Sequence, residues 1–329
     1  MQRAFGGSDV LELCDVPVPR LEPGSLLVRT TAIGVNFHDI ESRRGPEPGI
    51  PVPGVPGSDV VGVVEKVGAG VQGFSPGQRV VGVTRGGAYA ELTVVPARCA
   101  AVVPDRVSDV LAASVPVAGL TAWLLLQDLL TADKSSEDGP SRRAVVAYAA
   151  AGGVGCWLGG LLRNTPVSTV GVVSAGKVDV ALRAGYDEVV VRGAAPGLVA
   201  GVQRATRWRG GADLVLDPVA GPDFAQSFEL LRPGGTVVLF GRAGGPPAVD
   251  GLAAAFLDAR RDTALRTFFL TRALLTRMAA VPAALAFLLE GLDRGDVRMP
   301  VTEFPLADAA KAQDLISSGV TTGKLVLRP

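Results

Sequence analysis

The sequence predicts an α/β protein with a doubly wound parallel sheet in the middle of the chain and a β-rich part formed by both ends. From about Ala118 onward, short apolar runs alternate with stretches long enough for a helix, which is typical of βαβ units. Before that point, short strand-like runs are bounded by Gly and Pro, and the chain ends in another such run. With 329 residues, the chain is long enough for two domains with separate cores.

The N-terminal third is predicted to consist of short strands joined by turns, namely Leu26–Thr31, Val60–Val67, Arg79–Val83 and Ala90–Val94. Between the first two lies the Pro-rich segment Pro46–Pro56. A polyproline ligand for a partner protein has such a composition. A rigid loop is favoured instead, because the segment is short and is followed by Gly57 and a strand.

The middle of the chain is predicted to form the parallel sheet, with strands at Ala144–Ala149, Ser168–Val173, Glu188–Val191, Leu214–Asp217 and Thr236–Phe240. The polar, turn-rich insert Thr131–Arg143 is predicted to be a surface loop. After about Asp258 the pattern is that of amphipathic helices, and a final strand is expected at Lys324–Leu327.

The composition indicates a soluble globular protein. The chain has 32 basic and 32 acidic residues, so its formal net charge of zero argues against nucleic-acid binding. Three widely spaced cysteines without a CxxC pair argue against a disulfide framework and favour a reducing, cytoplasmic location. The first residues lack the apolar segment of a secretory signal, and arginines interrupt the most apolar region, Leu265–Leu289, so no membrane association is expected.

The run Ala149–Gly155 (AAAGGVG) between a predicted strand and a predicted helix indicates a dinucleotide phosphate site. Glycine lets the backbone turn sharply and approach a pyrophosphate, and the N-terminus of the helix, over Cys156–Arg163, offers N–H groups to the anion. A tight turn between core elements is the alternative. Cys156 has two interpretations, a thiol with a lowered pKa at a helix start or a small apolar helix residue, and the second is favoured.

The end of the next strand indicates which nicotinamide cofactor the site takes. A site selective for NAD places Asp or Glu here, to bind the ribose 2′-hydroxyl. This chain has Ser174 and Lys177 instead, a hydroxyl and a cation suited to the 2′-phosphate of NADPH. The alternative for Lys177 is an exposed surface charge.

Further motifs resemble a known family and occur in its order: Gly34–Asp39 (GVNFHD), Pro56–Val64 (PGSDVVGVV), Gly87–Glu91 (GAYAE), Gly119–Trp123 (GLTAW) and Gly323–Leu327 (GKLVL). Together with the glycine turn they resemble the medium-chain dehydrogenase/reductase superfamily, in its zinc-independent (zeta-crystallin-like) quinone oxidoreductase branch. The resemblance implies a Rossmann domain and a discontinuous GroES-like catalytic domain. The expected divisions are 1–118 GroES-like, 119–262 Rossmann and 263–329 as the return to the catalytic domain, with the ligand cleft between the lobes.

The resemblance also implies that no metal is bound. Asn36 stands where the zinc branch has its first cysteine ligand, and Ser58 stands where that branch has a histidine. The lobe with four closely spaced cysteines is also missing from the sequence.

By resemblance, the cofactor would contact two sets of residues. The phosphates would be bound by Ala149, Gly152, Gly153, Val154, Gly155, Ser174, Lys177 and Arg192. The nicotinamide part would lie near Thr121, Phe240, Gly241 and Lys324. Arg192 replaces a tyrosine of the family and is expected to stack on adenine or add a second cation, with an exposed charge as its alternative.

The candidate catalytic residues are Asn36, Glu41 and His38. Asn36 is expected near the nicotinamide ribose, with turn capping as its alternative. Glu41 occupies a position where family members carry a tyrosine, and it could donate a proton if burial raised its pKa. An exposed glutamate beside Arg43 and Arg44 is the favoured interpretation. His38 is the single histidine, but its position varies in the family, so a non-catalytic role is preferred.

The expected function is hydride transfer from NADPH to a quinone or an α,β-unsaturated carbonyl compound, in bacterial specialised metabolism. The alternatives are an enoyl reductase of polyketide assembly, a non-catalytic NADPH-binding protein, and a family member repurposed for a non-redox step. Solvent can protonate the reduced product, so a protein acid is not required. A homodimer is expected, with Thr263–Leu270 as an edge strand or interface helix.

Overall fold

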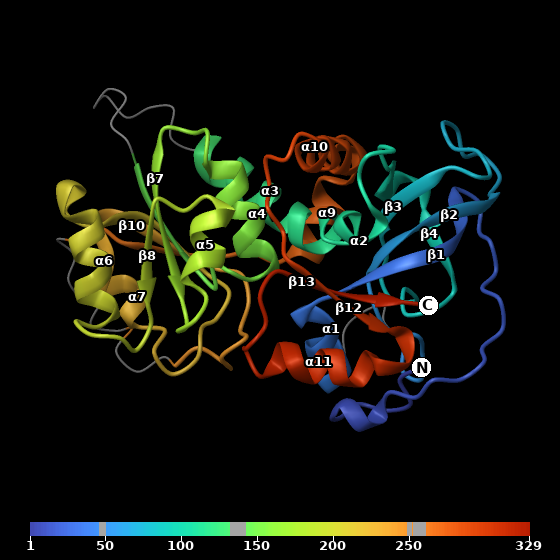
Figure 1. Ribbon diagram of the computed structural model, residues 1–329, viewed down its shortest axis with the longest axis horizontal. Helices are drawn as coiled ribbons and strands as arrows, with labels where there is room; N and C mark the ends of the chain where they lie inside the picture. Colours follow the sequence, from blue (N-terminus) through green and yellow to red (C-terminus); the bar gives the residue numbers. More distant parts are fainter. Residues whose placement is uncertain (46–50, 132–142, 249–251, 253–260) are drawn as a thin grey trace. The chain divides into compact units, whose positions relative to one another are not determined.

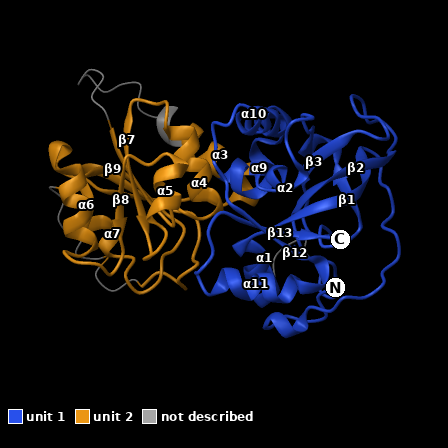
Figure 2. Ribbon diagram, in the orientation of Figure 1, with its two compact units in different colours: residues 1–121, 274–329 blue, residues 122–273 orange. Residues whose placement is uncertain are grey.

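A computed structural model describes residues 1–45, 51–131, 143–248, 252 and 261–329 (Figure 1). The chain divides into two compact units, which Figure 2 shows in different colours. Unit 1 comprises Met1–Thr121 and Leu274–Pro329, and unit 2 comprises Ala122–Ala273. Both ends of the chain therefore belong to unit 1.

Unit 2 is built on a parallel sheet with strand order β11-β10-β9-β6-β7-β8, in which every neighbouring pair runs parallel. Its strands are β6 Arg143–Tyr148, β7 Val167–Val173, β8 Glu188–Val191, β9 Ala212–Asp217, β10 Leu231–Leu239 and β11 Ala264–Thr267. The chain starts at β6, adds two strands on one side and then three on the other. The order therefore reverses between β6 and β9, and open α/β sheets bind ligands outside the carboxyl ends of the strands at such a point.

Helices cover both faces of this sheet. Among the described residues of 120–276, the helices are α3 Leu120–Thr131, α4 Gly153–Leu162, α5 Val178–Ala184, α6 Leu198–Thr206, α7 Gln226–Glu229 and α9 Leu270–Thr276, with a 3₁₀ turn at Arg207–Arg209. In Figure 1, α4 and α5 lie side by side on the opposite side of the sheet from α6 and α7. The backbones of α4 and α5 can approach closely because Gly159 has no side chain. A Cβ at this position would lie only 2.9 Å from Ala184 O.

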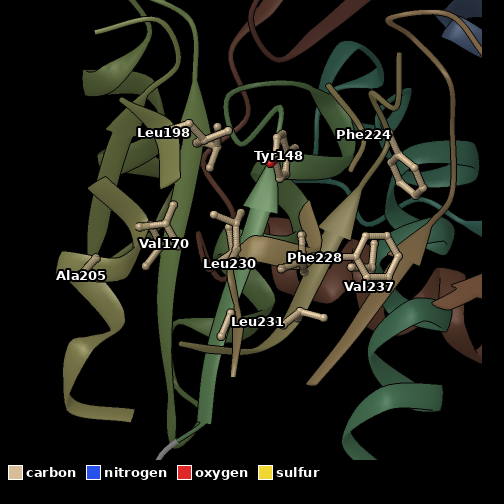
Figure 3. Close-up of a cluster of buried hydrophobic side chains, with 14 of the residues drawn as sticks. Tyr148, Val170, Leu198, Ala205, Phe224, Phe228, Leu230, Leu231 and Val237 are labelled. Carbon is tan, nitrogen blue, oxygen red and sulfur yellow. The ribbon is translucent and has the colours of Figure 1, made fainter. Parts of the chain in front are cut away.

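The face covered by α6 and α7 carries a hydrophobic core of unit 2 (Figure 3). Valines of the central strands pack there against Leu198 of α6 and Phe228 of α7. The rings of Phe224 and Phe228 meet edge to face, with centroids 5.9 Å apart and planes at 88°. Because the central strands are buried on both faces, their sequences are mainly apolar, which makes them recognisable in the sequence.

Unit 1 contains a second sheet with strand order β12-β13-β1-β2-β3-β5, and β4 also pairs with β1. Its strands are β1 Ser25–Val35, β2 Asp59–Val67, β3 Arg79–Val83, β4 Leu92–Pro96, β5 Ala100–Val102, β12 Val301–Pro305 and β13 Lys324–Arg328. The terminal strand β13 pairs antiparallel with β1, with Gly34 opposite Val326. The end of the chain is thereby joined to the strand that leads into Asn36.

Short helices and turns complete unit 1. They are α1 Phe37–Arg44, α2 Asp109–Ala112, α10 Val281–Asp293 and α11 Ala309–Ser317, with 3₁₀ turns at Ser8–Val10, Ala97–Cys99, Met278–Ala280 and Leu306–Asp308 and a π-helical turn at Val115–Gly119. The core packs Leu26, Val28 and Ile33 of β1 against Leu325 and Leu327 of β13.

The predicted fold class, a Rossmann-type parallel sheet with a β-rich discontinuous part, is confirmed. The fourth N-terminal strand lies slightly later than predicted, at Leu92–Pro96. Thr263–Leu270 contains an edge strand, β11. Residues 51–56 of the predicted loop Pro46–Pro56 are described and contain no helix or extended strand, although Gly54 forms an isolated β-bridge with Gln2. Residues 46–50 and most of the predicted loop Thr131–Arg143 lie outside the described residues. Among the helices that the structure describes, none is by itself long and apolar enough to cross a membrane, and one pair bent by 90°, Leu270–Thr276 with Met278–Asp293, passes that test only when taken together.

Candidate functional site

The segment after β6 folds as a tight turn that leads directly into α4. Ala149 has a left-handed backbone (φ 51°), and Gly152 N–H donates to Ala149 O at 2.8 Å. Helix α4 begins at Gly153, and Cys156 N–H donates to Gly152 O at 2.8 Å. The N–H groups of the first helical turn have no carbonyl four residues earlier to bind. They make this helix start suited to an anion such as a pyrophosphate.

Gly155 is required at its position by close packing. A Cβ there would lie 2.3 Å from Ala149 O and 2.6 Å from Ala150 O, inside van der Waals contact. The phenol of Tyr186 donates to Gly155 O at 2.8 Å and ties the helix start to the end of α5. The glycine therefore lets α4 lie directly against the turn that it follows.

Cys156 lies in the first turn of α4 and is fully buried. Burial raises the pKa of its thiol to about 12, so the thiol stays protonated at neutral pH. The interpretation of Cys156 as a small apolar helix residue is confirmed.

Ser174, Lys177 and Arg192 lie together at the ends of β7 and β8. Val173 and Val191 are paired at the ends of these strands, and Arg192 N–H donates to Val173 O at 2.8 Å. Lys177 N–H donates to Ser174 O at 3.3 Å, which closes the turn after β7. Burial, and secondarily the positive charge of Arg192, lower the pKa of Lys177. Two cations thus approach each other at one end of the sheet, and a bound phosphate would relieve their repulsion.

Phe240 and Gly241 follow β10, in a loop that main-chain hydrogen bonds join to the loop after β9. The donors Phe240 N–H, Ala243 N–H and Gly244 N–H bind the carbonyl oxygens of residues 217, 218 and 219 at 3.0, 3.0 and 2.7 Å. A Cβ at Gly241 would lie 2.7 Å from the residue-218 carbonyl oxygen, so glycine permits this approach. The two loops form one continuous backbone wall at the carboxyl edge of the sheet.

Asp217, the last residue of β9, holds the first of these loops. Its carboxylate accepts from Val219 N–H at 2.7 Å and from Ala220 N–H at 3.0 Å, and Ser227 Oγ lies 3.1 Å from its second oxygen. The carboxylate thus binds main-chain N–H groups two and three residues further on, as aspartates do in tight turns. Burial raises the pKa of Asp217, and these hydrogen bonds oppose that effect.

In unit 1, Asn36 and Lys324 meet in a buried polar cluster. Lys324 Nζ donates to Asn36 Oδ1 at 2.5 Å and to Asp59 Oδ2 at 2.7 Å, and Asn36 Nδ2 donates to Asp59 Oδ2 at 2.9 Å. The side chains of Lys324 and Asp59 are 3% and 0% exposed. Direct contact between Lys324 and a cofactor stays a prediction, since the contacts shown for its ammonium are with Asn36 and Asp59.

A second buried chain of polar groups adjoins Asn36. Asp39 Oδ2 accepts from Asn36 N–H at 2.8 Å and from the Tyr89 hydroxyl at 3.0 Å, and Gln313 Nε2 donates to the Tyr89 oxygen at 3.4 Å. Burial raises the pKa of Asp39 to about 6 and raises that of Tyr89 well above its usual range. The pKa of Asp39 therefore falls in the range where an acid is partly ionised near neutral pH.

His38 and Glu41 lie beside this cluster on α1, and both are partly exposed. The Ser42 hydroxyl donates to His38 O at 2.9 Å. The catalytic roles considered for both residues stay predictions. Thr121 is buried at the second position of α3.

Sequence reasoning missed the roles of three residues here: Asp39, Asp59 and Tyr89. Each lies in one of the quoted motifs, GVNFHD, PGSDVVGVV and GAYAE. The motifs pointed to these segments, but not to the contacts between them.

The residues of this cluster do not fit a metal site. An ammonium already bridges the amide oxygen of Asn36 and the carboxylate of Asp59. Within the part of the chain that the structure describes, no group of three or more His, Cys, Asp or Glu could hold a metal ion.

Comparisons with known proteins identify relatives along the whole chain. Profiles of two families match: "Alcohol dehydrogenase GroES-like domain" over residues 22–105 and "Zinc-binding dehydrogenase" over 184–327. A probable quinone oxidoreductase of Schizosaccharomyces pombe is 31% identical over 325 residues, 98% of this chain and 94% of that protein. A pikromycin polyketide synthase component of Streptomyces venezuelae is 33% identical over 314 residues, 93% of this chain but 8% of that protein. The crystal structure of Escherichia coli quinone oxidoreductase complexed with NADPH has a TM-score of 0.85, with 28% identity, over 99% of this chain and 98% of that one.

The two sheets, the glycine turn and the matched profiles define the class as a medium-chain dehydrogenase/reductase with a GroES-like part and a Rossmann part. Within that class, the similarity over nearly full length shows that this chain belongs to the quinone oxidoreductase family. The resemblance found in the sequence motifs is thereby confirmed.

Proposed function

We propose that this protein is an NADPH-dependent oxidoreductase that transfers hydride to a quinone or an α,β-unsaturated carbonyl compound. The observation that carries the proposal is the pair of cations, Lys177 and Arg192, at the ends of neighbouring strands. Ser174 stands there in place of the acidic residue of an NAD-selective site. The related E. coli enzyme, solved with NADPH, supports the same cofactor.

The residues of unit 2 fit this cofactor. The first N–H groups of α4 would bind the pyrophosphate, and Ser174, Lys177 and Arg192 would bind the 2′-phosphate. The wall formed by Phe240 and Gly241 would position the nicotinamide, which supplies the hydride when the cofactor is bound.

By the family resemblance, Asn36 and Thr121 are also proposed to bind the nicotinamide end and the substrate. We assign Lys324 to holding Asn36, because its ammonium is buried against that side chain. His38 and Glu41 are partly exposed. The proposed mechanism assigns neither of them a role, because solvent can protonate the reduced product. The domain divisions 1–118, 119–262 and 263–329 stay predictions, as do the cytoplasmic location and the place in specialised metabolism.

Calorimetry with NADPH and NADH tests the cofactor. We expect tighter binding of NADPH, and the change Lys177→Ala should weaken NADPH far more than NADH, because only NADPH carries the 2′-phosphate. Arg183→Ala is the matched control, since Arg183 is an exposed cation of the same unit that lies 3.8 Å from Asp179. Tighter binding of NADH would contradict the assignment.

Oxidation of NADPH, followed by its absorbance with a panel of quinones and a panel of enones and enoyl thioesters, tests the reaction. Turnover of either class supports the proposal. Binding of NADPH without turnover of either class would contradict it and favour a non-catalytic protein. The absence of cofactor binding would favour a repurposed site.

Enoyl reduction in polyketide assembly is the second candidate. It is favoured by the similarity of 93% of this chain to a short part of the pikromycin polyketide synthase component. Turnover of enoyl thioesters in clear preference to quinones would select it.

A homodimer through β11 is also proposed. This strand is at the edge of the sheet, three of its four residues are exposed, and the nearby Phe269 is 55% exposed. Light scattering should give twice the chain mass, and the change Phe269→Lys, at the exposed aromatic residue beside β11, should shift the protein to monomer. A monomeric wild-type protein would contradict the proposal.

A further inference from the structure

We infer that Asp59 and Lys324 are positioning residues for the reaction, which fix Asn36 and the segment before Thr121 with one buried ion pair. The inference rests on the proposed function, because that proposal assigns Asn36 and Thr121 to the cofactor and substrate. It rests in structural terms on contacts within unit 1 alone.

The carboxylate of Asp59 joins three segments that are far apart in the sequence. Its Oδ2 accepts from Asn36 Nδ2 at 2.9 Å and from Lys324 Nζ at 2.7 Å. Its Oδ1 accepts from Val117 N–H at 2.9 Å. Asp59 is fully buried, so no water competes for these hydrogen bonds.

Lys324 fixes the orientation of the Asn36 amide. Its ammonium donates to Asn36 Oδ1 at 2.5 Å, while Asn36 Nδ2 faces the Asp59 carboxylate. A flipped amide would place an NH₂ group against an ammonium and an oxygen against a carboxylate, which is repulsive on both sides. Asn36 Oδ1 is therefore held in one position.

The contact with Val117 extends the same control to Thr121. Val117 lies in the π-helical turn Val115–Gly119, and α3 begins directly after it at Leu120. One carboxylate thus fixes both proposed contacts with the cofactor and substrate.

Stability alone does not account for the pair. Buried ion pairs contribute little net stability, because desolvation offsets their attraction, and apolar residues of similar volume often serve as well. The surroundings are also shaped for the pair: a Cβ at Gly34 would lie 2.4 Å from Asp59 Oδ2 and 2.5 Å from Lys324 Cε. The small net stability expected of the pair and the close fit around it both indicate that the pair serves to position Asn36.

The test is the double variant Asp59→Asn/Lys324→Met, which removes both buried charges together. Reduction in the presence of saturating NADPH should slow about 100-fold, because a misplacement of about 1 Å at a reacting group can cost that much in rate. NADPH affinity should stay close to wild type, because unit 2 binds the phosphates. The kinetic isotope effect with 4-deuterated NADPH should rise as hydride transfer becomes rate-limiting.

The matched control is Arg79→Met/Asp109→Asn, which removes another ion pair of unit 1, with its charged atoms 2.6 Å apart. It should lower the melting temperature and leave kcat and the isotope effect unchanged. Adding Asn36→Ala to the Asp59/Lys324 variant should cause little further loss if the pair acts through Asn36.

A folded Asp59/Lys324 variant with wild-type kcat and isotope effect would overturn the inference, and so would losses that add fully to those of Asn36→Ala. If the double variant does not fold, Lys324→Arg provides the same readouts, and wild-type values for it would overturn the inference. If wild-type protein shows no turnover, the proposed function fails separately. In that case, hydrogen exchange of the Asn36 side-chain amide still tests the positioning role of Asp59 and Lys324. Faster exchange in the variants supports this role, and unchanged protection contradicts it.

Discussion

Burial of Asp39 should make the free energy of unfolding depend on pH. Asp39 is 3% exposed and accepts hydrogen bonds from Asn36 N–H and the Tyr89 hydroxyl. Burial outweighs these bonds and raises its pKa from 3.8 to about 6. A difference of about 2.2 corresponds to about 3 kcal/mol, at about 1.4 kcal/mol for each pH unit.

The sign follows from proton binding. The folded protein holds this proton more tightly than the unfolded chain does, so the contribution is fully present below the unfolded pKa of 3.8. This contribution is lost as the pH rises through about 6. Above that pH the carboxylate is ionised in both the folded and the unfolded state, and its cost to the folded state no longer changes with pH.

The change Asp39→Asn tests this, because an amide oxygen can still accept the two hydrogen bonds but does not titrate. In urea unfolding, wild type should lose about 2.4 kcal/mol relative to the variant between about pH 4 and about pH 7, since pH 4 already lies above the unfolded pKa and the contribution there is below its maximum. The exposed Asp179 gives the control, since Asp179→Asn should show no such difference. A wild-type-to-variant difference that stays constant with pH would refute the reasoning.

Three further predictions concern unit 2. Gly155→Ala should lower the free energy of unfolding by about 1–3 kcal/mol and weaken NADPH binding, because its Cβ would lie 2.3 Å from Ala149 O; calorimetry and urea unfolding measure both. Cys156, buried and with a pKa of about 12, should resist alkylation in the native protein while the partly exposed Cys14 reacts, as mass spectrometry can show; equal labelling would contradict this. Phe228→Ala should lower the free energy of unfolding by about 3–5 kcal/mol, because its ring is 1% exposed in the core; a loss below about 1 kcal/mol would contradict the packing described.

The parallel sheet could be predicted from the sequence because burial on both faces leaves a strong signal. Strands β6, β7 and β9 are apolar runs that end in recognisable turns. The edge strand β11 is weaker as a signal, since its exposed residues follow no apolar pattern, and so strand and helix both stayed open for it. The short strand β12 was missed for the same reason.

The candidate site was predictable in its backbone but not in its side-chain contacts. Glycines mark positions where only a residue without a Cβ fits, so the turn at Ala149–Gly155 can be recognised from sequence. The cluster of Asn36, Asp59 and Lys324 joins residues up to 288 positions apart, and no local pattern encodes such a contact. The motif with Lys324 indicated that the lysine matters, but not that its ammonium lies buried.

The wall at the carboxyl edge of unit 2 has a consequence for how this protein can change. The loops after β9 and β10 are joined by main-chain hydrogen bonds, and these do not depend on which side chains the loops carry. The contact between the two loops requires a particular residue at certain positions, such as Asp217 and Gly241. Exposed side chains on these loops can be exchanged while these main-chain hydrogen bonds persist. The scaffold that we propose for the nicotinamide can therefore keep its shape while residues on its loops change.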